Sequence, residues 1–155
     1  MATGMLHLHN ILRWVILILL LASVIKSFTG WQSKKALTNG DKKLWLITMV
    51  FVNITFVVGL YLLLFGRFGM FTTTLPEGTS VMKDSFYRFF WVEHPLLNII
   101  AVALISIGRG QAKKAIPDTT KYKKAFWFFF IALIVLLISI PWPGREIGRP
   151  LFPGM

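Results

Sequence analysis

The chain has 155 residues, of which 55% are hydrophobic and 15% charged, and its mean hydropathy of +0.67 is too high for an ordinary soluble domain. It contains no cysteine, which excludes disulfide exchange, thiolate chemistry, cysteine-held iron–sulfur clusters and covalent attachment of a c-type haem. The net charge of +11 is concentrated in two short segments, a distribution that favours the loops of a membrane protein over nucleic-acid binding.

Four long apolar segments predict an all-α membrane protein with an up-down-up-down bundle of four transmembrane helices. We expect the helices at about residues 8–26, 44–66, 86–108 and 124–141, within a single transmembrane domain over residues 1–155. The residues before the first segment lack the basic region of a signal peptide, and no cleavage site follows it. We therefore expect the first segment to remain in the protein as a helix.

The two basic segments predict the orientation. Of the 17 Lys and Arg residues, five lie in residues 26–43 and six in residues 109–124. Short basic loops between transmembrane helices are typical of the cytoplasmic side. We therefore expect a multi-pass protein of the bacterial inner membrane with both termini outside, and anionic lipid is a sufficient partner for the basic loops.

The two basic loops are also similar to each other. Residues 30–37 read Gly-Trp-Gln-Ser-Lys-Lys-Ala-Leu, and residues 110–116 read Gly-Gln-Ala-Lys-Lys-Ala-Ile. This similarity is compatible with two repeated helical hairpins related by an axis along the membrane normal. The alternative is that lysine-rich loops and interfacial tryptophans arose independently in each half.

Polar residues that are costly in lipid open the first and third segments, and such residues indicate a site by default. His9 precedes Lys26 by 17 residues, and His94 precedes Arg109 by 15. At about 1.5 Å per residue, both histidines lie roughly 23–26 Å above the inner boundary. In a four-helix bundle the first and third helices are diagonal neighbours, so we expect these two side chains to meet across the core.

The helical period indicates which side chains share a face. Arg13 projects on the side of His9, and Asn98 on the side of His94, because each pair is four residues apart. His7 lies about 200° around the helix from His9, so we expect His9 to face the bundle, with His7 as the substitute.

Pro95 predicts an irregularity in the third helix. A helix that began at this proline would be too short to span the membrane, so its start must lie earlier, at a cap formed by Asp84 or Ser85. Proline inside a helix removes one backbone hydrogen bond and bends the helix. We therefore expect a bend beside His94.

Two neutral imidazoles at one depth on parallel helices are the ligand set of a b-type haem. The sequence therefore suggests a monohaem cytochrome that works as an electron-transfer component. The assigned residues are His9 and His94 as iron ligands, Arg13 with Arg145 or Arg149 for the propionates, and Asn98 or Glu93 for the second ring nitrogen of a histidine.

Three other interpretations remain open. The histidines and Arg13 are also compatible with ordinary headgroup-level residues, and hence with a cofactor-free accessory or assembly subunit of a larger membrane complex. If residues 6–10 were extended, His7, His9 and His94 would form a three-histidine copper or zinc site. No paired carboxylates, phosphate-binding loop or nucleophile motif points to an enzyme, and polar residues are too few for an ion path.

The second and fourth segments contain no histidine, so the chain supplies ligands for one haem only. A single haem near the outer face cannot carry electrons across a hydrocarbon layer of about 30 Å. We therefore expect exchange with a quinone pool or with a protein partner on the outer side, at the loop Arg67–Lys83 or the tail Arg145–Met155. A homo-oligomer is a further possible partner arrangement.

Four short stretches carry a family resemblance: Leu8-His9-Asn10-Ile11-Leu12-Arg13-Trp14, Val81-Met82-Lys83-Asp84, Arg88-Phe89-Phe90 and Glu93-His94-Pro95. With them the chain resembles small bacterial four-helix membrane proteins described as cytochrome b-like. The resemblance covers nearly the whole chain and implies haem b with His9 and His94 as ligands. The chain departs from two-haem transmembrane cytochromes, which need four histidines on paired helices, whereas this chain has three.

Overall fold

A computed structural model describes residues 2–152, and within that range the chain contains helices and no strand. The helices are α1 (Ala2–Gln32), α2 (Asn39–Phe65), α3 (Ser85–Arg88), the π-helix η1 (Phe89–Glu93), α4 (His94–Gly110), the short η2 (Gln111–Lys113) and α5 (Asp118–Ser139). Segments α3, η1, α4 and η2 follow one another without a gap. With this run counted as one, four helices are long and apolar enough to cross a membrane, which confirms the predicted fold class.

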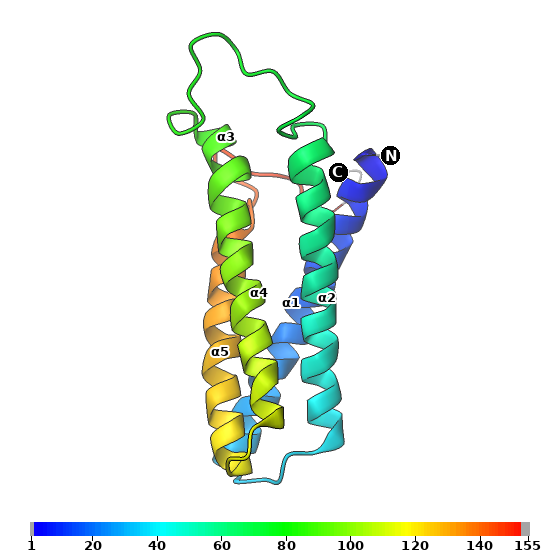
Figure 1. Ribbon diagram of the computed structural model, residues 1–155, viewed down its shortest axis with the longest axis vertical. Coiled ribbons are helices and arrows are strands. Elements are labelled where there is room, and N and C mark those ends of the chain that lie inside the picture. Colours follow the sequence, from blue (N-terminus) through cyan, green and yellow to red (C-terminus); the bar gives the residue numbers. More distant parts are fainter. Residues whose placement is uncertain (1, 153–155) are drawn as a thin grey trace.

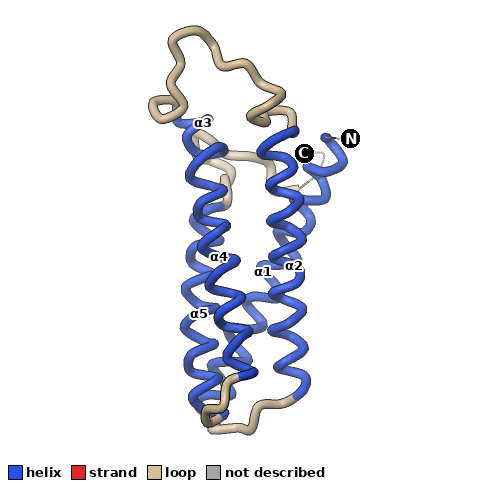
Figure 2. The backbone as a smooth tube through the Cα atoms, viewed as in Figure 1, coloured by secondary structure: helices blue, strands red, loops and turns tan. Residues whose placement is uncertain are grey.

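The four long helices form one elongated bundle in which the chain reverses direction at each connection (Figure 1). Helix α1 packs against α2 and α5, and α4 packs against the same two helices. Helices α1 and α4 therefore face each other diagonally, as predicted. Figure 2 shows the N-terminus, the loop 66–84 and the C-terminal tail at one end, with the two basic connections at the other.

The helices extend further than the apolar segments predicted. Helix α1 runs over residues 2–32 instead of 8–26, and α5 begins at Asp118 instead of residue 124. Hydropathy marks the part of a helix that suits hydrocarbon, whereas the backbone hydrogen bonds of a helix continue into water without penalty. Helix α1 then ends in a left-handed turn at Lys34, whose φ is 51°.

The third long helix begins where the sequence predicted. The carboxylate of Asp84 accepts hydrogen bonds from the main-chain nitrogens of Phe86 and Tyr87, so Asp84 is the N-cap. The irregularity expected at Pro95 takes the form of the π-helical turn η1, in which the N–H of His94 donates to the carbonyl of Phe89. Pro95 has no N–H for the next helical bond, and π turns are frequent at functional sites.

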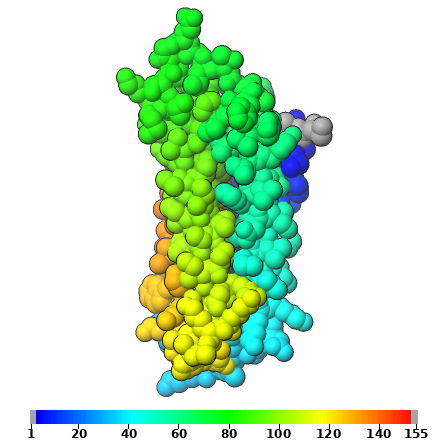
Figure 3. Space-filling view, viewed as in Figure 1, coloured from blue at the N-terminus to red at the C-terminus, as the bar shows by residue number. Residues whose placement is uncertain are grey.

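The tightly packed core fills the part of the bundle from its middle to the basic end. Its largest fully buried side chains include Leu20, Trp45, Ile105, Tyr122 and Phe129. The core ends where the histidines begin, near the end at which the loop 66–84 covers the bundle in the space-filling view (Figure 3). Residues 153–155, which belong to the tail expected to contact a partner, lie outside the described residues.

Candidate functional site

The rings of His9 and His94 lie next to each other across the diagonal of the bundle. Their centres are 6.2 Å apart and their planes are inclined by 69°. His9 comes from α1 and His94 is the first residue of α4, so two helices that otherwise barely touch meet through these side chains. The depth argument from the sequence predicts this meeting.

His94 is oriented by the end of α5. The helix stops at Ser139 because Pro141 and Pro143 follow and have no N–H to continue the helical bonds. In a continuing helix residue 143 would donate to the carbonyl of Ser139, so this oxygen is left free. It lies 2.7 Å from Nδ1 of His94. A carbonyl oxygen only accepts, so Nδ1 carries the hydrogen, and Nε2 of the neutral ring keeps its lone pair.

The ring of His9 lies against Gly59 of α2, which has no side chain. A Cβ atom at Gly59 would lie 3.1 Å from Cε1 and 3.6 Å from Nδ1 of His9, so any side chain here would require the ring to shift by a few tenths of an ångström or more. The backbone of Thr55, one turn earlier on α2, also borders the ring. Nδ1 is buried and makes no hydrogen bond within residues 2–152. The ring therefore presents Nδ1 to α2 and leaves Nε2 as its candidate ligand atom.

Aromatic side chains enclose His94 on the η1 side. The ring of Phe89 is only 2% exposed, and its centre lies 5.8 Å from that of His94. The ring of Phe90 lies 6.4 Å from the same imidazole. The guanidinium of Arg145 stands over the ring of Phe89, 5.3 Å from the ring centre. These rings cover one side of His94 and lower the local dielectric there.

Of the predicted arginines, Arg13 contacts the tail, Arg145 bonds from the tail to the end of α5, and the guanidinium of Arg149 stands over the ring of Phe90, 5.4 Å from its centre. Arg13 donates to the main-chain oxygen of Leu151, which also accepts a bond of 3.1 Å from the indole of Trp14. Arg145 donates hydrogen bonds of 3.3 Å to the carbonyls of Ile138 and Ile140. The tail therefore folds back over the end of the bundle that holds the histidines.

Neither Glu93 nor Asn98 bonds to the ring nitrogen of His94, which is the role that the sequence analysis assigned to one of them. Glu93 forms a salt bridge of 2.9 Å with Arg88. The amide of Asn98 donates to the main-chain oxygen of His94 rather than to its ring. The acceptor that holds the His94 ring is the carbonyl of Ser139, a residue that the sequence analysis did not select. The pair of prolines after it is the signal that could have identified it.

The three-histidine arrangement is not formed. Residues 6–10 are helical, so the extended backbone that this site requires is absent. The ring of His7 packs against neither of the other two imidazoles in the described range. No group of three or more histidine, aspartate or glutamate side chains between residues 2 and 152 is placed to hold a metal ion.

Two neighbouring imidazoles are the donor set that a bis-histidine haem would need. Two metal–imidazole bonds of about 2.0 Å, with about 1.1 Å from each ring centre to its nitrogen, place two ring centres about 6.2 Å apart across a shared ion. The observed separation of the ring centres equals this value, and it equally falls in the range of direct edge-to-face ring contact, which the 69° inclination of the planes resembles. The hydrogen bond to Nδ1 of His94 is the outer-shell contact that metal-bound histidines commonly make. Comparisons with protein-family models, curated proteins and solved structures give no match for this chain.

Proposed function

We propose that this protein is a monohaem b-type cytochrome that serves as an electron-transfer component of a membrane. The observation that carries the proposal is the pairing of His9 and His94 at 6.2 Å, with Nδ1 of His94 bonded to a backbone carbonyl. One hydrogen bond thereby fixes the ring and its tautomer, and Nε2 is left with a lone pair for iron.

The residues of the chain have distinct tasks in this proposal. His9 and His94 would hold the iron, and Gly59 would leave room for the His9 ring. Arg13, one turn from His9, and Arg145, over the ring of Phe89, would face the propionates. A haem held in this way supplies one-electron oxidation and reduction. Phe89 and Phe90 cover one side of His94, and the lower polarity on that side would favour the less charged form of the iron centre.

The position of the pair near one end of the bundle decides which partners are accessible. A single haem there would exchange electrons on that side only, because the hydrocarbon layer is about 30 Å thick. The exposed loop Arg67–Lys83 and the described part of the tail are the surfaces for a protein partner, and a quinone is the alternative partner within the lipid. The basic connections at the opposite end support an orientation with that end in the cytoplasm of a bacterial cell.

The proposal is tested on protein purified from membranes of cells that make haem. We expect a reduced-minus-oxidised difference spectrum of the b type, with one haem per chain, which His94→Ala abolishes. His7→Ala is the matched control on α1 and should keep the full spectrum. A colourless preparation would contradict the proposal and favour a cofactor-free accessory subunit, and copper or zinc in metal analysis would favour a small metal site.

A further inference from the structure

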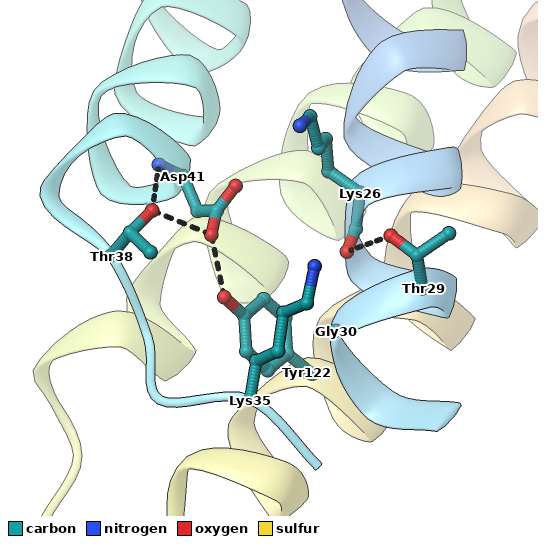
Figure 4. Close-up of a pocket in the computed structure, with 7 residues that line it drawn as sticks. All are labelled: Lys26, Thr29, Gly30, Lys35, Thr38, Asp41 and Tyr122. Carbon is teal, nitrogen blue, oxygen red and sulfur yellow. Dashed lines mark hydrogen bonds between the residues drawn. The ribbon is translucent and has the colours of Figure 1, made fainter. Parts of the chain in front are cut away.

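A second site lies at the opposite end of the bundle, far from the histidines. It is a pocket of about 120 Å³ between α1, the loop that follows it, α2 and the start of α5. The side chains that line it are mainly polar: Lys26, Thr29, Lys35, Thr38, Asp41 and Tyr122 (Figure 4). Water occupies about 30 Å³ per molecule in the liquid, so the pocket has room for a phosphate group and a neighbouring ammonium.

Two exposed lysine side chains that line this pocket have no acidic partner within residues 2–152. Neither Lys26 nor Lys35 forms an ion pair in the described part of the chain. Figure 4 shows the side chain of Lys35 running beside the ring of Tyr122, with its Nζ in the same space between α1 and α2 that Lys26 borders. Two lysine side chains at the border of one pocket favour a bound anion.

The same pocket also holds one carboxylate in a fixed position. Oδ2 of Asp41 accepts hydrogen bonds from the hydroxyls of Tyr122 at 2.5 Å and Thr38 at 2.7 Å. The ring of Tyr122 is buried against Gly30, so it cannot move away. Both bonds reach one oxygen, and the other carboxylate oxygen is left for a donor from outside. A ligand that carries only negative charge would not bond to this carboxylate, whereas a zwitterion with an ammonium group would.

The depth of the pocket indicates a lipid as the ligand. Lys26 is the first charged residue on α1 after Arg13, and it stands 19 residues after His7. This separation is roughly 28 Å along a helix, close to the thickness of about 30 Å of the hydrocarbon layer. Lys26 therefore lies where lipid phosphates lie if the bundle spans a bilayer. Basic pockets between transmembrane helices at this level bind lipid headgroups.

We propose that this pocket binds the headgroup of phosphatidylethanolamine. The phosphate lies between the ammonium groups of Lys26 and Lys35, and the ethanolamine ammonium donates to the free oxygen of Asp41. This arrangement uses all three charges of the pocket. Phosphatidylcholine has the same charges but no N–H to donate, and phosphatidylglycerol has no cation, so each would use only part of the site.

Native mass spectrometry of the full chain in detergent tests the proposal, with the three lipids added separately at equal concentration and with identical acyl chains. We expect phosphatidylethanolamine to be retained about tenfold more than phosphatidylcholine, a difference of about 1.4 kcal/mol. The double variant Lys26→Gln/Lys35→Gln should lose this retention. Asp41→Asn should remove the preference over phosphatidylcholine, because an amide is a weaker acceptor for an ammonium.

The double variant Lys113→Gln/Lys114→Gln is the matched control, since it removes two exposed charges at the same end but outside the pocket. It should retain the lipid like the wild type. The side chains of Lys26 and Lys35 are exposed and make no hydrogen bond among residues 2–152, so we expect their substitution to leave the fold intact. Equal retention of the three lipids, a preference for phosphatidylglycerol, or equal loss in the control variant would overturn the proposal.

Discussion

Nδ1 of His94 donates to the main-chain oxygen of Ser139 across 2.7 Å, although the two residues are 45 positions apart in the chain. The bond joins the irregular start of α4 to the end of α5. Its acceptor exists because two prolines remove the donors that a continuing helix would supply. The geometry of the candidate site is therefore determined by residues that carry no ligand atom.

Replacing these prolines tests that dependence. In Pro141→Ala/Pro143→Ala, two new N–H groups compete for the carbonyls of α5, and the helix can extend by a turn. We expect the variant to fold but to retain several-fold less haem than the wild type, measured as haem per chain after purification. Pro150→Ala lies beyond the helix end and should have no effect. Equal haem content in both variants would show that the Ser139 carbonyl does not orient His94.

Gly59 gives a second test of the pair. A leucine at this position would occupy the space in which His9 lies, because even a Cβ atom comes within 3.1 Å of Cε1. We expect Gly59→Leu to displace the ring and to remove most of the bound haem. Val57→Leu adds bulk on an exposed position of the same helix and is the control. Full haem binding in Gly59→Leu would place the iron ligand elsewhere than His9.

The membrane architecture could be predicted from the sequence because it depends on the composition of whole segments. The pairing of His9 with His94 could also be predicted, since counting residues from each basic loop gives the depth of each histidine. The partner of the His94 ring could not be predicted in this way. It depends on where the end of α5 lies relative to α4, and that relation follows from packing between segments far apart in the chain.

The surroundings of Tyr122 predict a steric limit at the basic end of the bundle. A Cβ atom at Gly30 would lie between 2.5 and 2.7 Å from three carbons of the Tyr122 ring. The ring is buried and its hydroxyl is bonded to Asp41, so it cannot yield. We expect Gly30→Ala to lower the free energy of unfolding by about 1–3 kcal/mol in SDS titration. Gly110→Ala, where a Cβ atom meets nothing within 4 Å, should change it little.

Replacing Lys34 with glycine should have the opposite effect on stability. Its φ of 51° lies in the left-handed region, and its main-chain nitrogen closes the end of α1 by donating to Trp31. That conformation costs a non-glycine residue about 1–2 kcal/mol, of which about 0.5–1 kcal/mol is offset by the greater freedom of glycine in the unfolded chain. Lys34→Gly should therefore stabilise the protein by up to about 1 kcal/mol, whereas Lys43→Gly, inside α2, should destabilise it by a similar amount.

The hydrogen-bond partners of Asn98 and Glu93 could not be predicted from the sequence. The helical period placed Asn98 on the face of His94, yet its amide returns to the main-chain oxygen four residues earlier. Glu93 precedes His94 directly, yet its charge is paired with Arg88. Both side chains satisfy their polar groups within their own helix, and this local choice depends on rotamers that residue spacing does not determine.

The claim that His9 and His94 share one iron is tested most directly by the spin state of the oxidised protein, read by electron paramagnetic resonance at low temperature. Two imidazole ligands predict a purely low-spin ferric signal in the wild type and in His7→Ala, and a high-spin signal in His9→Ala and His94→Ala wherever haem is retained. A high-spin wild type, or a change of spin state on His7→Ala, would contradict the assignment.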